Sequence, residues 1–176
     1  MPYDLHRHLE GSHSPRALLD VARAHELRDA AFYDEARRAW RSEAELRTRL
    51  TLAAPSDDAS LFYECIKVAR RAYVSVEAIG ELARQAFLEA AADTDGFEMR
   101  LSLFSMARTL LENRGVALKD VGPSAFADAW ARPILLAVLA ARDAAQRETG
   151  KAMLLRLGLS RTFESEPHYR ALAEVV

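Results

Sequence analysis

Two histidines near the start of the chain have the type and spacing that could do chemistry. His6 and His8 stand in the run Leu5-His6-Arg7-His8-Leu9-Glu10-Gly11. Side chains at positions i and i+2 of an extended strand point to the same face, so two imidazoles could reach one divalent metal ion. Gly11 would let the chain turn away, which places Glu10 at the mouth of the site. The alternative for a bare His-x-His pair is a half-exposed edge strand without metal.

The other histidines do not extend this pair into a motif. His13 follows the turn at Gly11, and we expect its side chain to point outward. His25 and His168 fall in predicted helices, and we expect both on helix surfaces. A catalytic zinc site takes at least three protein ligands. The sequence therefore offers two ligands of a zinc site and not the whole site.

The composition is that of an ordinary globular protein. Half of the 176 residues are apolar, and 24 basic and 26 acidic residues leave a formal charge of −2. There is no basic stripe interleaved with aromatic residues, which disfavours a nucleic-acid polymer as partner. No apolar run approaches the ~20 residues of a membrane helix, and the start of the chain leaves no room for a secretory signal. The single cysteine, Cys65, cannot form an internal disulfide and is expected in an apolar helix face. These features favour a cytoplasmic protein without membrane contact.

Hydrophobic periodicity and capping residues predict alternating strands and helices. The predicted strands are 3–8, 97–104 and 153–159, and the predicted helices are 14–27, pieces of 28–50, 61–73, 75–93, 133–150 and 165–176. A loop containing Gly115, Gly122 and Pro123 is expected between the second strand and the helix at Pro133. This order favours a parallel sheet with crossover helices, either doubly wound or a barrel. Within the second strand, Glu98 and Arg100 are expected to form a structural pair joined by hydrogen bonds.

The motifs occur in the order found in a known family. The run His6-Arg7-His8-Leu9-Glu10-Gly11-Ser12 resembles the opening of the adenosine/adenine deaminases, metal-dependent amidohydrolases with two zinc-binding histidines in His-x-His-x-[Asp/Glu]-Gly. Leu61-Phe62 and Ile66 are similar to a segment that lines the substrate entrance in that family. Glu98-Met99-Arg100-Leu101-Ser102 resembles its second strand, and Arg161 with Pro167 resembles the end of its third.

This resemblance implies a fold, a reaction and a set of site residues. Residues 1–176 would form an incomplete (β/α)8 barrel of the TIM type, with about three strands and their helices. His6 and His8 would bind Zn²⁺, and Glu10, Gly11, Phe62 and Ile66 would contact the substrate. The reaction would be hydrolytic deamination of a 6-aminopurine such as adenine or adenosine, with zinc supplying hydroxide at neutral pH.

The chain also departs from the family pattern. Leu101 and Leu103 replace a usual phenylalanine and proline, and the His-Ala-Gly-Glu motif that carries the third zinc histidine and the catalytic glutamate is absent. We therefore expect no catalytic residue in this segment, and we expect the remaining strands in a continuation or a partner chain. One alternative is a truncated, non-catalytic remnant of the family. Another is an unrelated α/β fold, which predicts no contact between the strands near 3–8 and 97–104.

Overall fold

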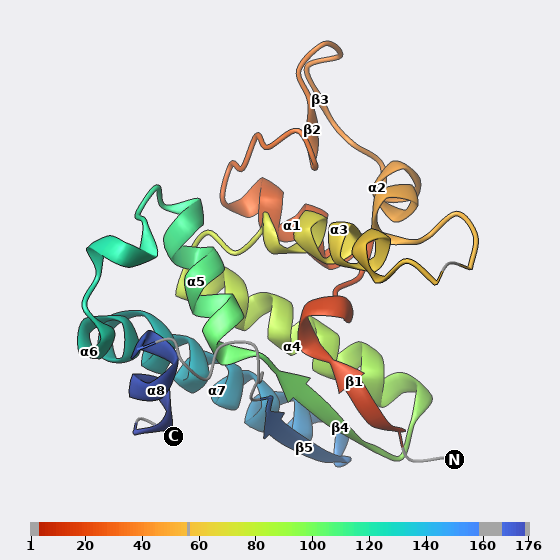
Figure 1. Ribbon diagram of the computed structural model, residues 1–176. Coiled ribbons are helices and arrows are strands. Elements are labelled where there is room, and N and C mark those ends of the chain that lie inside the picture. The colour runs from red at the N-terminus through yellow and green to blue at the C-terminus, as the bar shows by residue number, and fades with distance from the viewer. Residues whose placement is uncertain (1–3, 56, 159–166, 175–176) are drawn as a thin grey trace.

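A three-stranded parallel sheet with helices packed on one face organises this α/β protein (Figure 1). The computed structural model describes residues 4–55, 57–158 and 167–174. The strands are β1 (Asp4–His8), β4 (Gly96–Leu101) and β5 (Ala152–Leu157), in the order β1-β4-β5. The predicted alternation of strands and helices is confirmed. β1 pairs with β4, so the prediction of no contact between these strands, which was made for an unrelated fold, is wrong.

The central strand β4 has a regular partner on one side and an irregular one on the other. It pairs with β5 without interruption from Gly96 opposite Ala152 to Leu101 opposite Leu157. On the other side Asp4 lies opposite Phe97 and His8 opposite Arg100, with a register shift between Asp4 and Arg7. The irregularity therefore falls on the part of β1 that contains His6.

Helices α4 (Val76–Asp93) and α7 (Arg132–Thr149) pack together against one face of the sheet (Figure 1). The Ser75 side chain caps α4 by accepting a hydrogen bond from the Ala78 N–H at 3.0 Å, as the sequence indicated. The apolar residues of α4 recur at helical spacing and are buried, and the Phe87 ring stacks on Phe97 of β4 at 6.0 Å. Gly150, with φ of 69°, ends α7 in the left-handed conformation that glycine adopts without strain.

The segment after β1 is less helical than the sequence suggested. Helices α1 (Pro15–Ala24) and α3 (Ala59–Arg70) lie close to their predicted ranges. Between them, the prediction of helical pieces over 28–50 is correct only for α2 (Glu43–Leu50). A short hairpin of β2 (Tyr33–Asp34) and β3 (Ala39–Trp40) precedes α2. The Asp34 carboxylate accepts the Arg37 N–H, and Arg38 takes a positive φ of 51°, so the tip is a tight turn rather than a helix.

A helix not predicted from the sequence follows β4. The second strand was expected to continue to residue 104, but it ends at Leu101, and α5 runs from Leu103 to Asn113. The apolar residues of α5 have helical spacing and are buried: Leu103, Phe104, Met106, Ala107, Leu110 and Leu111. The strand-like alternation from residue 97 masked this start because Leu103 fits both the strand period and the helix period. A short turn, Leu118–Asp120, follows α5.

The last long helix begins ten residues earlier than predicted. Pro123, not Pro133, opens it, through α6 (Pro123–Phe126) and a π-helical turn, Ala127–Ala131, into α7. By length and composition alone, the continuous helix from Pro123 to Thr149 is apolar enough to cross a membrane. The sequence has no uninterrupted apolar run of this length, because Asp128, Arg132 and Arg142 divide it. The helix is weak evidence for a membrane span, since α7 also packs on α4.

The final helix, α8 (Pro167–Ala173), corrects one prediction about a histidine. Its predicted start at Ser165 lies outside the described residues, as does the Leu159 end of β5. His168 was expected on the helix surface, but it is buried, with its ring edge against Phe126 at 5.5 Å. Its Nε2 atom is within hydrogen-bond distance of the Val121 carbonyl. The helix turns His168 inward because Tyr169 and Leu172 anchor the same side of α8.

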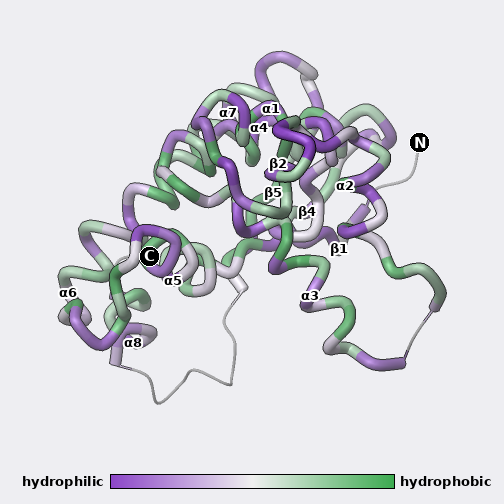
Figure 2. Tube along the Cα trace, turned by 90° about the horizontal axis from the view of Figure 1, so that it is seen from above, coloured by the Kyte–Doolittle hydropathy of each residue, from purple (hydrophilic) through white to green (hydrophobic). Residues whose placement is uncertain are grey.

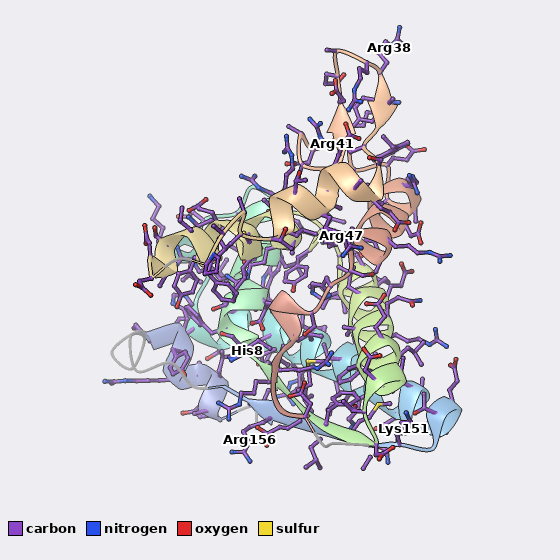
Figure 3. All side chains as sticks on the ribbon, turned by 90° about the vertical axis from the view of Figure 1, so that its right-hand side faces the viewer. His8, Arg38, Arg41, Arg47, Lys151 and Arg156 are labelled. Carbon is purple, nitrogen blue, oxygen red and sulfur yellow. The ribbon has the colours of Figure 1, made fainter. Side chains whose placement is uncertain are left out.

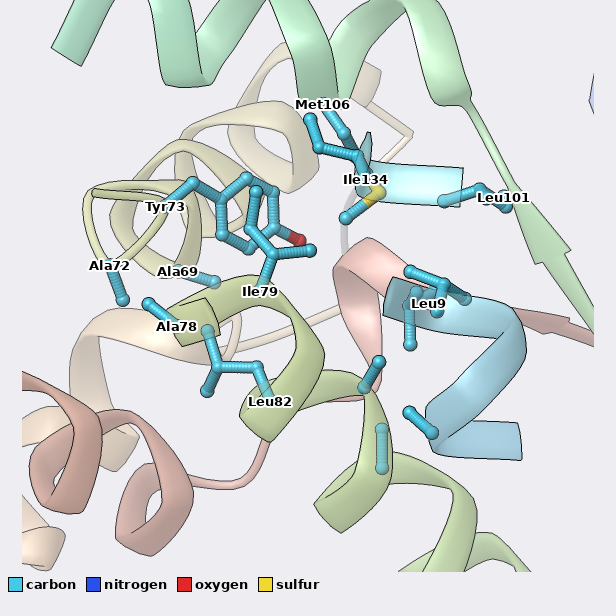
Figure 4. Close-up of a cluster of buried hydrophobic side chains, with 14 of the residues drawn as sticks. Leu9, Ala69, Ala72, Tyr73, Ala78, Ile79, Leu82, Leu101, Met106 and Ile134 are labelled. Carbon is cyan, nitrogen blue, oxygen red and sulfur yellow. The ribbon is translucent and has the colours of Figure 1, made fainter. Parts of the chain in front are cut away.

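Buried side chains from several helices meet beside the end of β1 (Figure 4). Tyr73 lies here between Ala69 and Ile79, and Leu9 lies close to α7 below them. All of these side chains are almost fully buried. Figure 2 shows α3 extending away from the sheet, and its first turns are exposed although Leu61, Phe62 and Tyr63 are apolar.

The burial of β4 gives a testable prediction. Met99 is fully buried on the central strand, whereas Leu154 on β5 is 63% exposed. Met99→Ala should lower the free energy of unfolding by about 2–5 kcal/mol, because it leaves a cavity in the core. Leu154→Ala should cost less than about 0.5 kcal/mol, since that side chain is already in water. Urea denaturation measures both, and equal losses would contradict this account of the sheet.

Candidate functional site

Three side chains lie in one row across the carboxyl-terminal part of the sheet. His8 is opposite Arg100, and Arg100 is opposite Arg156, so the three share one face. That face is opposite the one on which Phe97 meets Phe87 of α4. His8 and Arg156 are both exposed, and Figure 3 labels them on the two edge strands of this sheet. The backbone of His6 belongs to β1, and its side chain lies outside the described part of the structure.

A buried carboxylate holds this row together. Glu98 is almost fully buried, with its Oε1 atom 3.2 Å from the Arg100 Nε and its Oε2 atom 2.9 Å from the Arg156 Nη2. The predicted pair of Glu98 and Arg100 is confirmed. Arg156 is a second partner that the sequence did not reveal, because it depends on the register between β4 and β5. Both oxygens of Glu98 are thereby engaged, so the residue orients the two arginines.

The described residues contain no group of three histidine, cysteine or acidic side chains that could hold a metal ion. Imidazole is a suitable ligand for zinc, so His6 and His8 have the right chemistry for two positions of such a site. They fall short of the three protein ligands that a catalytic zinc ion takes. A complete metal site therefore requires ligands beyond those that this part of the chain provides.

Glu10 connects the end of β1 to the end of β4. It is buried in the short turn Leu9–Gly11, and its Oε1 atom accepts a hydrogen bond from the Ser102 N–H at 3.0 Å. The Nη2 atom of Arg70, at the end of α3, lies 3.8 Å from the same oxygen. Ser102 and Arg70 were not identified as its partners from the sequence, since the hydrogen bond spans 92 residues. Glu10 thus fixes the loop that follows the two histidines.

The residues that the sequence grouped as substrate contacts line one pocket. Glu10, Gly11, Phe62 and Ile66 all border a pocket of about 160 Å³ between the β1 turn, α2 and α3. Cys65 also borders this pocket. It was predicted on an apolar helix face, and its side chain is half-buried. Phe62 is 51% exposed, so it stands at the rim of the pocket. The structure brings these four residues together, whereas His8 does not line this pocket.

His13 is placed differently from its prediction. It was expected to point outward, but it is 8% exposed and borders the same pocket. A 2.7 Å hydrogen bond joins its Nε2 atom to the hydroxyl group of Tyr73, which lies just after the end of α3. Burial lowers the pKa of His13 to about 4, and burial together with the negative charge of Glu10 raises the pKa of Tyr73. Both groups are therefore neutral at pH 7, which suits a buried pair joined by a hydrogen bond.

Comparison with known proteins gives a likeness of fold. No protein-family model matches the chain, and no curated protein matches it. Among solved structures, adenine deaminase from Arthrobacter aurescens is similar to it, with a TM-score of 0.59 and 17% sequence identity. The match covers 88% of this chain and 38% of the deaminase chain. This chain thus spans well under half the length of that protein, and the likeness concerns the fold.

The buried state of His13 predicts a pH dependence of stability. Its pKa is about 4 in the folded protein and about 6.5 when exposed, so between these values the unfolded state binds a proton that the folded state does not. Stability should therefore fall by about 3 kcal/mol as the pH drops from 6.5 to 4.

Urea denaturation at a series of pH values measures this loss. His13→Gln should remove most of the slope between pH 6.5 and 4, because the titrating group is gone. His25→Gln, a half-buried histidine at the end of α1, should keep the slope. An unchanged slope in His13→Gln would assign the pH dependence to other groups.

Proposed function

We propose that this chain forms the first three strands of a metal-dependent hydrolytic deaminase that acts on a 6-aminopurine. In this proposal β1, β4 and β5 are neighbouring strands of a (β/α)8 barrel, and Zn²⁺ is the metal. The similarity of fold to an adenine deaminase supports it at the level of a deaminase-like hydrolase. The observation that carries the finer proposal is the His6-Arg7-His8-Leu9-Glu10-Gly11 run at the carboxyl end of a parallel strand.

The position of this run suits a catalytic site. In parallel α/β barrels, active sites lie at the carboxyl ends of the strands, where the loops gather. His8 is the last residue of β1, and Glu10 is tied to Ser102 immediately after the end of β4. The histidines would therefore lie beside a loop whose path is fixed by a buried hydrogen bond. When bound, the metal would supply a water of lowered pKa for attack on the purine.

The pocket beside Glu10 suits one wall of a substrate site. Its volume of about 160 Å³ is smaller than that of most small-molecule sites, which are about 300 Å³ or more. Phe62 and Ile66 offer apolar contact for a planar ring, and Glu10 offers a carboxylate acceptor. We infer that the substrate lies against this wall and that the opposite wall comes from strands beyond these three.

A second candidate is a non-catalytic remnant of the same family. Both candidates account for the absence of a group of three metal ligands from the described residues. This candidate predicts weak or no metal retention and no deamination even when the remaining strands are supplied. The two candidates therefore differ in what a continuation or partner chain would restore.

The proposal gives a direct test with the two histidines. The 176-residue chain alone should release no ammonia from adenine or adenosine at any zinc concentration, because it lacks the remaining ligands. Together with the continuation or partner that carries them, it should retain zinc and release ammonia. His6→Ala and His8→Ala should each remove both properties, whereas His25→Ala should keep both. Zinc analysis after dialysis and an ammonia assay measure them, and an active His8→Ala would contradict the assignment.

A further inference from the structure

We propose that a cleft between α3 and α5 binds the phosphate group of a small molecule. The cleft has a volume of about 430 Å³, within the range of small-molecule sites. Four cationic side chains border it, together with two hydroxyl groups. They are Lys67, Arg70, Arg71, Arg108, Ser105 and Thr109. The inference does not depend on the deaminase proposal, since none of these residues is a predicted metal or substrate ligand.

Helical spacing gathers these groups on two facing surfaces. Lys67, Arg70 and Arg71 stand at positions i, i+3 and i+4 at the end of α3, so they share one side of it. Ser105, Arg108 and Thr109 have the same spacing in α5. Both sides border the cleft, so donors approach a ligand from two directions. Such convergence distinguishes the cleft from a helix surface that happens to be basic.

Each of the four cationic side chains has a carboxylate partner, and these pairs are either solvent-exposed or longer than a hydrogen bond. Lys67 pairs with Glu64 and Arg108 with Glu112, each within one helix and largely exposed. Pairs of this kind contribute about 0.3–0.5 kcal/mol, so a stronger anion can displace them. The Nη1 atom of Arg71 lies 3.8 Å from the Asp29 carboxylate, beyond hydrogen-bond distance. The side chains that border the cleft include four cations and one carboxylate, that of Glu112.

Arg70, which borders the cleft, also has a hydrogen-bond donor that an anion could satisfy. Its Nε atom is buried and has no hydrogen-bond partner among the described residues. Its Nη2 atom approaches Glu10 only to 3.8 Å, which is an ion pair without a hydrogen bond. A buried donor without a partner costs about 1–3 kcal/mol. A small shift of this side chain toward an anion in the cleft would satisfy it.

The donors suit a phosphate better than a carboxylate. A phosphate dianion presents three strong acceptor oxygens, and arginine binds it through two parallel hydrogen bonds. The Ser105 hydroxyl accepts from Ser102 at 2.9 Å, which leaves its own proton available to donate. Phe104 adds an apolar part to the lining, which suits the organic portion of a phosphate ester. The chain's formal charge of −2 favours a small ligand over a nucleic-acid polymer.

Calorimetric titration with ribose 5-phosphate tests the proposal, with ribose as the comparison. This ligand carries no purine, so its binding is separate from the success or failure of the deaminase proposal. Ribose 5-phosphate should bind saturably and less tightly as salt is raised, and ribose should not bind. Inorganic phosphate is the second arm: equal affinity would identify free phosphate as sufficient, and weaker affinity would identify a phosphate ester. No saturable binding of either up to about 10 mM, where a millimolar site would be mostly filled, would overturn the proposal.

Matched variants locate the binding. Arg108→Ala should weaken affinity about tenfold, the effect of losing one charge-assisted hydrogen bond, and Lys67→Ala should also weaken it. Arg132→Ala is the control, because Arg132 is about as exposed as Arg108 and also pairs with an acidic residue four positions away. It should leave affinity unchanged. Equal weakening by Arg108→Ala and Arg132→Ala, or tighter binding of an oligonucleotide than of ribose 5-phosphate, would overturn the proposal.

Discussion

The pairing of strand β4 along both of its edges is the constraint on which the structure depends. One face of β4 is buried through Phe97 and Met99, and the other carries the buried carboxylate of Glu98. A buried carboxylate is costly unless it is paired, so Arg100 and Arg156 must both reach Glu98. The register with β5 makes this possible, and the register with β1 adds His8 to the same row. The two hydrogen-bond ladders of β4 thus stabilise the sheet and decide which side chains share its open face.

The face of the sheet opposite α4 and α7 resembles a surface that further elements of a protein usually cover. Parallel sheets are usually buried on both faces, whereas in the described residues α4 and α7 cover one face. Leu154 is 63% exposed on the other face, beside the charged row. The proposed barrel accounts for both observations, because its remaining strands would enclose Leu154 and the row together. It also accounts for a metal motif with two histidines, since the other ligands would lie on those strands.

The sequence predicted elements that have one clear local signal, and it failed where local signals were mixed, as at the start of α5, or where distant residues decide. The cap at Ser75, the burial of α4 and the three strands follow from local spacing, and all are present. The outward position predicted for His13 was wrong because its hydrogen bond to Tyr73 spans 60 residues. The role of Glu10 in joining two strand ends depends likewise on Ser102, 92 residues away. The convergence of Glu10 with Phe62 on one pocket came from family resemblance and has no local signal.

Arg70 relates the two proposed sites to each other. It lies between Glu10, which borders the pocket beside β1, and the cleft between α3 and α5. One guanidinium group cannot approach a phosphate more closely without changing its distance to Glu10. If phosphate changes the affinity of the Glu10 pocket for its ligand, that ligand must change the affinity for phosphate by the same factor, because coupling between binding sites is reciprocal. The 3.8 Å separation of Arg70 and Glu10 is longer than a hydrogen bond, so a shift of the guanidinium group toward the cleft would break no hydrogen bond to Glu10.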